Sequence, residues 1–229
     1  MRILHVAPTY LPAVRYGGPI HSVHGLCRAL AELGHDVHVF TTSVVGPDDS
    51  DVPLAEPVDL DGVKVWYFAA PLLRRLYYAP GMARQLRNSL PGFDLLHLHS
   101  VFLWPTAMAA RLASGAAVPY VLSPRGMLFR ELIRRKSRLL NSAWIRLFEQ
   151  SNLEKACMVH VTSAVEARGL EEFDFNLRRV VEIPNGVELP QDYAEAALSE
   201  DIAEIISRGS YVLFFGRINW KKGLDRLLE

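Results

Sequence analysis

Two glycine-bearing turns in this sequence carry residue types that can bind phosphate without a metal ion. Gly17 and Gly18 precede a helix-forming segment, and a helix start offers free N–H groups and the positive end of the helix dipole. Gly216 is followed by Arg217 and Lys222, and two cations beside a helix start can neutralise a diphosphate. The first pair lacks the G-x-G-x-x-G spacing of dinucleotide sites, and on its own it fits a ligand loop and a flexible turn equally well.

Histidine and arginine side chains lie at the ends of predicted strands. His97 and His99 are two residues apart, so both point to the same face of a strand. Two histidines can bind zinc, but no third ligand is obvious, so we predict no metal site, a substrate contact for His99, and structural roles for His97 and His5. Arg125 follows another strand, where it could bind an anionic group of a substrate or form a salt bridge with the next helix.

Two further patterns have simpler interpretations. Asp49-Ser50-Asp51 matches a D-x-D pattern that holds divalent metal in some enzymes, but no apolar strand directly precedes it, so we interpret it as a solvated loop. Residues 130–146 interleave basic and apolar side chains. Such a stretch can dock on anionic lipid or bind a charged acceptor, but we favour a solvated helix face over an apolar core stripe. No nucleic-acid motif accompanies it.

The apolar pattern predicts the scaffold that would bring these strand ends together. Apolar runs alternate with helix-period segments, which indicates an α/β, Rossmann-like, doubly wound and mostly parallel sheet. Ligands bind such sheets at the carboxyl ends of the strands. We expect strands over 3–7, 36–42, 63–68, 94–99, 119–123, 158–162, 180–183 and 211–215, a long loop over 44–62, and helices over 19–33, 78–90, 102–113, 129–155 and 164–173.

Composition narrows the class of protein. The chain has 229 residues, is 50% hydrophobic and has a formal net charge of zero, so no global charge attracts nucleic acid or membrane. Cys27 and Cys157 form no CxxC pair, which predicts reduced, buried thiols in a cytoplasmic protein. Pro8 interrupts the N-terminal segment too early for a signal peptide, and no apolar run reaches membrane-spanning length.

The sequence divides into three parts. Residues 1–187 are predicted to form the first domain, residues 188–209 a polar and acidic linker, and residues 210–229 the first strand and helix of a second, truncated domain. A single strand and helix cannot bury their own apolar face. The strand around Val212 to Phe215 is therefore expected to expose an unpaired edge, through which two copies of the chain could dimerise.

Taken together, these segments resemble a GT-B glycosyltransferase of family 4, a large group of retaining nucleotide-sugar transferases. The resemblance runs through the whole chain and rests on the order and spacing of its parts. The matching segments are Ile3-Leu-His-Val-Ala-Pro with Gly17-Gly18, Ala29-Leu-Ala-Glu-Leu-Gly-His-Asp-Val-His-Val39, Asp94-Leu-Leu-His-Leu-His99, Val161-Thr-Ser-Ala-Val-Glu166, Ile183-Pro-Asn-Gly-Val187, and Gly216-Arg217 with Lys221-Lys222-Gly223.

The resemblance implies two Rossmann-like lobes facing across a cleft, with residues 1–187 binding mainly the acceptor and the second lobe mainly the nucleotide sugar. It implies that the loop of Gly17 and Gly18 lies near the donor phosphates or the acceptor. His99 and Arg125 would contact the acceptor. The catalytic residues implied are Arg217 and Lys222, which would stabilise the departing diphosphate.

The reaction implied transfers a hexose from a donor such as UDP- or GDP-hexose, with retention and without metal or other cofactor. The acceptor would be a hydroxyl of a glycan, a lipid-linked saccharide or a small molecule. We expect a cytoplasmic protein, with peripheral contact to the inner face of the membrane as a further option.

Two features set the chain apart from the family pattern. Many relatives carry His-Gly near the reacting sugar, where this chain has Arg125-Gly126. The acidic donor-binding motif is expected beyond Glu229, so we expect an incomplete fragment, natural or engineered, that is inactive alone. Two alternatives stay open: a non-catalytic sugar or nucleotide-sugar binding protein that needs a partner lobe, and a sugar-nucleotide epimerase of GT-B architecture.

Overall fold

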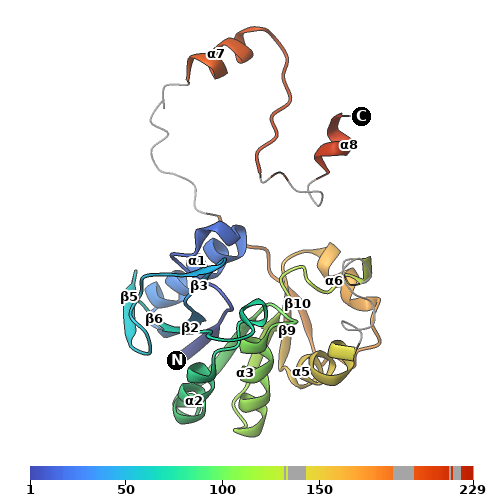
Figure 1. Cartoon of the computed structure of the whole chain (residues 1–229). Coiled ribbons are helices and arrows are strands. Elements are labelled where there is room, and N and C mark those ends of the chain that lie inside the picture. The colour runs from blue at the N-terminus through green and yellow to red at the C-terminus, as the bar shows by residue number, and fades with distance from the viewer. Residues whose placement is uncertain (132, 134–142, 188–198, 217, 219–222, 229) are drawn as a thin grey trace. The chain divides into compact units, whose positions relative to one another are not determined.

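The structure, a computed structural model, describes residues 1–131, 133, 143–187, 199–216, 218 and 223–228. The chain separates into two compact units, Met1–Val187 and Glu188–Glu229, which are coloured from blue to orange and from orange to red in Figure 1. The helices of the first unit are α1 (Gly18–Glu32), α2 (Pro80–Ser89), α3 (Trp104–Gly115), α5 (Gln150–Lys155) and α6 (Ala164–Glu171), with 3-10 turns at Val14–Tyr16, Arg74–Leu76 and Leu90–Gly92.

An eight-stranded sheet forms the centre of the first unit, in the order β10-β9-β8-β7-β1-β2-β6-β5. Every neighbouring pair is parallel except β5 with β6, which confirms the predicted α/β, mostly parallel fold. The strands are β1 (Arg2–Val6), β2 (Asp36–Thr42), β5 (Pro57–Leu60), β6 (Val63–Phe68), β7 (Leu95–His99), β8 (Tyr120–Ser123), β9 (Met158–Val161) and β10 (Val180–Glu182).

Helices cover both faces of this sheet. On one face, Val23 and Cys27 of α1 pack over valines of β2 and β6. On the other face, α2, α3, α5 and α6 contribute to a larger apolar core that includes Leu4, Leu96 and Leu122 of the central strands. Because side chains alternate along a strand, the residue that follows each of these leucines points to the face that carries α1.

The predicted loop over residues 44–62 is wrong in part. It contains a short antiparallel hairpin, β3 (Val44–Val45) with β4 (Asp48–Asp49), and the edge strand β5. Residues of β5 alternate between exposed and half-buried, so this strand lacks the continuous apolar run that marks a buried strand. Pro57 opens β5, and proline is tolerated at the start of an edge strand.

The predicted helix over residues 129–155 lies partly outside the described residues. Its described C-terminal part is a π-helical turn over Ile145–Glu149 followed directly by α5. Such turns interrupt the regular helix and often place a side chain for a particular role. Here the turn ends on Glu149, a carboxylate with only 1% of its surface exposed.

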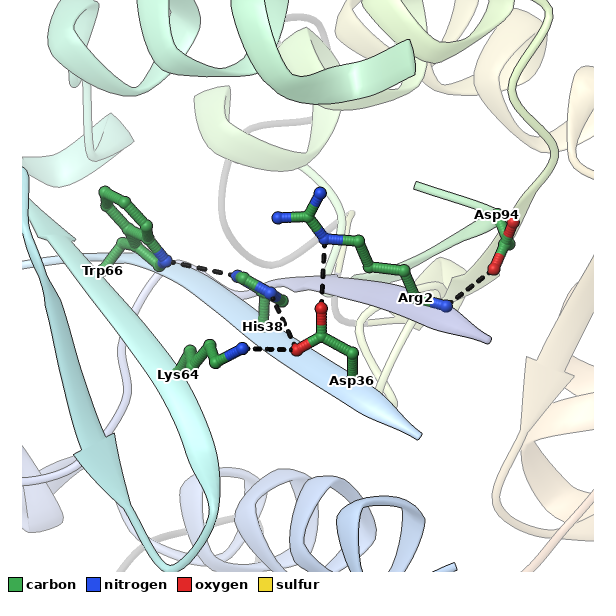
Figure 2. Close-up of polar contacts among 6 residues, drawn as sticks. All are labelled: Arg2, Asp36, His38, Lys64, Trp66 and Asp94. Carbon is green, nitrogen blue, oxygen red and sulfur yellow. Dashed lines mark hydrogen bonds and ion pairs between the residues drawn. The ribbon is translucent and has the colours of Figure 1, made fainter. Parts of the chain in front are cut away.

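A network of charges joins the amino ends of β1, β2 and β6 (Figure 2). The Asp36 carboxylate lies 2.8 Å from Lys64 Nζ and 3.2 Å from Arg2 Nε, and it accepts from His38 Nε2 at 3.2 Å. The backbone N–H of Arg2 donates to Asp94 at 2.6 Å. Asp94 directly precedes β7, so these contacts link the starts of β1, β2, β6 and β7 at the amino end of the sheet.

The second unit is described in part. It contains α7 (Glu200–Ser207) and α8 (Leu224–Leu228). The strand predicted over residues 211–215 is not formed, because the described part of this unit supplies no partner strand to take up its backbone hydrogen bonds. Its apolar side chains are exposed, as expected: Val212 is 78% exposed and Phe215 is 98% exposed.

Candidate functional site

The strand order creates a switch point beside β1. The chain leaves β1 toward β2 on one side, whereas β7 and β8 lie on the other side. Loops after the carboxyl ends of β1 and β7 therefore diverge, and ligands of open α/β sheets bind at such a position. α1 connects the parallel strands β1 and β2, so it begins at the carboxyl end of β1 and brings Gly17 and Gly18 to this end of the sheet.

Glycine is required at the first position of that turn. Gly17 has φ 82° and ψ −148° and is the N-cap of α1, a conformation that side chains rarely adopt. Among the described residues no side chain caps the start of α1, and apart from neighbouring backbone no atom lies within 4 Å of a Cβ placed on Gly18. The turn is therefore open to a ligand, and a dedicated role for it remains a prediction.

Three histidines meet at the carboxyl ends of β1 and β7. His5 is the register partner of His97, and His99 follows two residues later, so all three share the sheet face that carries α1. The His5 and His99 rings are stacked with centroids 5.3 Å apart, and the His97 and His99 centroids are 4.2 Å apart. We call His5, His97 and His99 the histidine cluster.

Arg125 orders one hydrogen-bond chain through this cluster. Its Nη2 lies 3.1 Å from His99 Nδ1, and a guanidinium only donates, so His99 Nδ1 accepts. Neutral His99 then carries its proton on Nε2 and donates to His5 Nδ1 at 3.0 Å. His5 is left with a buried Nε2–H that has no hydrogen-bond partner among the described residues.

A second chain runs across β8 to β9. His160 Nε2 lies 2.9 Å from the Ile183 carbonyl oxygen, which only accepts, so His160 Nδ1 must accept from the Ser123 hydroxyl at 2.8 Å. Ser123 Oγ in turn accepts from His97 Nε2 at 2.7 Å. His97 is thus satisfied through Ser123, as predicted for a structural histidine.

Burial keeps these imidazoles neutral. Desolvation, and then the charge of Arg125, lowers the pKa of His5 to about 3. Desolvation is also the main cause that holds the pKa of His97 and of His99 well below the usual value. The pKa of Arg125 itself is lowered by burial, but a guanidinium stays charged at neutral pH. Arg125 is therefore the fixed positive charge of the site.

The expectation that no third metal ligand exists needs correction, because His5 supplies one. One nitrogen from each member of the cluster lies within 4.8 Å of the others. A metal-bound histidine needs its second nitrogen to donate to an acceptor, whereas His99 faces the donor and positive charge of Arg125. This arrangement suits an anion better than a cation, and the absence of a metal from the site stays a prediction.

Two buried carboxylates hold the loops of the site in strained conformations. Ser100 and Phe102 after β7 have φ of 75° and 62°, and Arg125 has φ 56°, values that cost energy in residues other than glycine. Glu149 accepts from the Phe102 N–H at 2.7 Å, and burial raises the pKa of Glu149. Glu166 accepts from the N–H of the residue after Arg125 at 2.6 Å.

The structure thus brings together two of the predicted site residues, His99 and Arg125, in direct contact. His99 is only 2% exposed, so a ligand entering from solvent meets Arg125 first. The predicted catalytic residues Arg217 and Lys222 lie outside the described residues, as does most of the basic stretch over 130–146. Sequence reasoning missed Glu149 and Glu166, although the spacing of Ser163 and Glu166 is that of a capping box.

Two other predictions concern residues away from this site. The Asp49 carboxylate is occupied by Arg74 at 3.1 Å and by the Ser43 hydroxyl at 2.9 Å, which accounts for it without a metal. Cys27 is buried as predicted, but Cys157 is exposed, so the prediction of two buried thiols is wrong for that residue. Among the described residues no helix has the length and apolar character to span a bilayer.

Comparisons with known proteins identify a family and a common fold for this chain. The sequence profile described as "Glycosyl transferase 4-like domain" matches residues 17–186. No curated protein sequence matches the chain. Sucrose-phosphate synthase from Thermosynechococcus elongatus has a similar structure with a TM-score of 0.60 at 18% identity, covering 82% of this chain and 48% of that one.

A second structure titled for the same synthase gives a TM-score of 0.55 at 17% identity and covers 91% of this chain and 98% of that one. HepE from Anabaena, in complex with UDP and glucose, gives 0.54 at 16% identity and covers 82% and 45%. The chain spans about half the length of the full synthase and of HepE. At these identities the likeness shows a common fold.

Proposed function

This chain belongs to the family of glycosyl transferase 4-like domains, and from that membership we propose that it is the acceptor-binding lobe of a nucleotide-sugar-dependent glycosyltransferase. Its fold is that of the N-terminal lobe of GT-B enzymes. Because the chain spans about half of the similar full-length structures, the transfer reaction is proposed for the whole protein, and these residues alone are proposed to be inactive.

The observation that carries the proposal is the position of the site. The glycine turn before α1, the histidine cluster and Arg125 all lie at the carboxyl ends of neighbouring strands β1, β7 and β8, where this kind of sheet binds ligands. Arg125 and open backbone N–H groups supply donors there for anionic and hydroxyl oxygens. These are the groups that sugars and sugar phosphates present.

We assign the steps of the reaction to residues as follows. Gly17 and Gly18 approach the donor phosphates or the acceptor, and His99 and Arg125 position the acceptor, His99 acting beneath Arg125. Arg217 and Lys222 stabilise the charge that develops on the departing nucleoside diphosphate. With these cations the transfer of a hexose from a UDP- or GDP-linked donor proceeds with retention and needs neither metal nor cofactor.

The proposed partners are a nucleotide sugar and a glycan, lipid-linked saccharide or small-molecule acceptor. HepE, which has a similar fold, was solved with UDP and glucose, which supports a UDP-linked donor. We place the reaction in the cytoplasm because the two cysteines are free thiols, with a membrane-bound acceptor as the reason for contact with the inner face. The exposed apolar segment around Val212 and Phe215 is proposed to pair in a homodimer, which light scattering at several concentrations tests.

The experiment that tests the proposal is a donor assay on the product of the whole coding sequence. UDP-glucose and GDP-mannose are incubated with mixed saccharide acceptors, and release of nucleoside diphosphate is followed together with the anomeric configuration of the product by NMR. Release that depends on acceptor and persists in EDTA is expected. Saturable donor binding without any transfer would instead favour a sugar-binding protein, and epimerised donor without acceptor would favour an epimerase.

A further inference from the structure

We propose that Arg125 binds a phosphate or carboxylate group of the acceptor, so that this protein selects anionic acceptors over neutral sugars. This inference rests on the proposed function, because only a transferase has an acceptor. It is carried by the contacts of one partly buried guanidinium, whose hydrogen-bond partners among the described residues are uncharged.

Every direct hydrogen-bond partner of Arg125 in the described part of the chain is neutral. Its Nη1 donates to Asn185 Oδ1 at 2.7 Å and its Nη2 to His99 Nδ1 at 3.1 Å. Its Nε–H is buried without a hydrogen-bond partner among the described residues. A guanidinium partly withdrawn from water is unfavourable unless it is paired. The charge of Glu166 offsets this cost in part through space, and a directly bound anion would complete the pairing.

The neighbouring carboxylate is committed elsewhere. One oxygen of Glu166 accepts from the Gly126 N–H at 2.6 Å, and the other accepts from the Thr162 N–H and hydroxyl at 2.8 and 2.9 Å. Glu166 therefore fixes the backbone that carries Arg125. Its charge acts on the guanidinium through space, but the direct partners of the guanidinium among the described residues are Asn185 and His99.

The backbone of the loop directs Arg125 toward the site. Arg125 and Gly126 are both left-handed, with φ of 56° and 69°, and the Ser100 N–H donates to the Ser123 carbonyl at 2.8 Å just before the turn. A strained conformation of this kind persists only where the surroundings enforce it, and such places are common at functional sites. Here the positive-φ backbone accompanies the contacts of the Arg125 guanidinium with His99 and Asn185.

The remaining donors suit a planar or tetrahedral anion. A guanidinium has five N–H donors in a rigid fork, and two of them meet Asn185 and His99. Nη1 and Nη2 each keep a second N–H besides the buried Nε–H, and these can bind oxygens of a phosphate or carboxylate. His5 Nε2–H is a second unpartnered buried donor behind the same hydrogen-bond chain. The cluster is neutral, so the anion would not be repelled.

The test is a titration of the 229-residue chain, and of the product of the whole coding sequence with UDP present, by isothermal calorimetry. The probes are glucose 6-phosphate, glucuronate, inorganic phosphate and glucose. At least one of the two anionic sugars should bind about tenfold more tightly than glucose, or better. The reason is that hydrogen bonds to a charged group are worth about one to two orders of magnitude in affinity. Arg125→Gln should remove the preference, and Arg125→Lys should keep only part of it because lysine lacks the fork.

Arg84→Gln is the matched control, because Arg84 is exposed on α2, and it should leave every affinity unchanged. Circular dichroism checks that each variant is folded. Equal affinity of the unmodified protein for glucose and for both anionic sugars would overturn the proposal whatever the variants do. Anion binding that survives Arg125→Gln, or binding of inorganic phosphate with no gain from the sugar, would overturn it too.

The donor assay separates this inference from the proposed function. Release of UDP in the presence of neutral acceptors, together with no preference for anionic sugars, would leave the glycosyltransferase proposal intact and remove only the inference about Arg125. Preference for anionic sugars without any transfer would support the inference as a binding property and count against the transferase.

Discussion

Replacing Glu166 should destabilise the first unit and loosen the loop that carries Arg125. Glu166 is 3% exposed and accepts from two backbone N–H groups and one hydroxyl. In Glu166→Gln one oxygen becomes an NH₂ group, which cannot accept, so the N–H of either Gly126 or Thr162 loses its partner inside the protein. In Glu166→Ala both lose it.

The magnitudes follow from the cost of leaving a buried donor unpaired. One lost charge-assisted bond with one unsatisfied N–H amounts to about 2–3 kcal/mol, so Glu166→Gln should lower the free energy of unfolding by that amount. Glu166→Ala removes all three bonds and should cost about 4–5 kcal/mol, near the upper end of single substitutions.

Urea unfolding followed by circular dichroism measures the change, with the slope against urea compared between variants. Hydrogen exchange then locates it: the amides of Gly126 and Thr162 should exchange faster in both variants relative to the rest of the sheet. Glu171→Gln serves as the control, since Glu171 is exposed on the same helix, α6. A loss below about 0.5 kcal/mol for Glu166→Gln, or unchanged exchange at both amides, would refute the assignment of Glu166 as the anchor of the loop.

Three further outcomes are expected. Acidification from pH 7 to 5.5 should lower the free energy of unfolding by about 1 kcal/mol for each histidine of the cluster. The reason is that His5, with its pKa lowered to about 3, stays neutral in the folded protein but binds a proton in the unfolded chain below about pH 6.5. A free energy of unfolding that does not fall would contradict this. Asp36→Asn should cost about 1 kcal/mol at pH 7 after allowance for solvent screening. Because the Lys64 hydrogen bond lowers the pKa of Asp36, this difference should vanish in urea titrations as the pH falls through the folded pKa. A thiol reagent should react quickly with exposed Cys157 and slowly with Cys27, which is buried and has its pKa raised to about 12. Rapid modification of both thiols would contradict the burial of Cys27.

The sequence predicted the fold best where elements are continuous and bounded. Residues 36–42 and 63–68 were predicted as strands and are β2 and β6 with the same limits, because each is an apolar run between turn residues. Edge strand β5 escaped prediction because an edge strand buries only alternate side chains. The segment over 211–215 has the composition of a strand, but strand formation needs a pairing neighbour, which composition does not supply.

The sequence singled out two residues of the candidate site and missed those that support them. Arg125 and His99 stand at predicted strand ends, where position alone marks them. His5 looked like an isolated core histidine, because only the pairing of β1 with β7 places it opposite His97. Glu149 escaped notice because its partner, the N–H of Phe102, lies 47 residues away in the chain. Contacts over such separations depend on topology, which local patterns do not reveal.

The central place of β1 bears on how the chain folds as the ribosome makes it. One side of β1 pairs with β2, but the other side pairs with β7, which is synthesised much later. At cellular elongation rates the nascent chain waits on the order of 5 s between these strands. Throughout that interval the buried strand β1 has a free side, so chaperone contact should concentrate on nascent chains that end before His99.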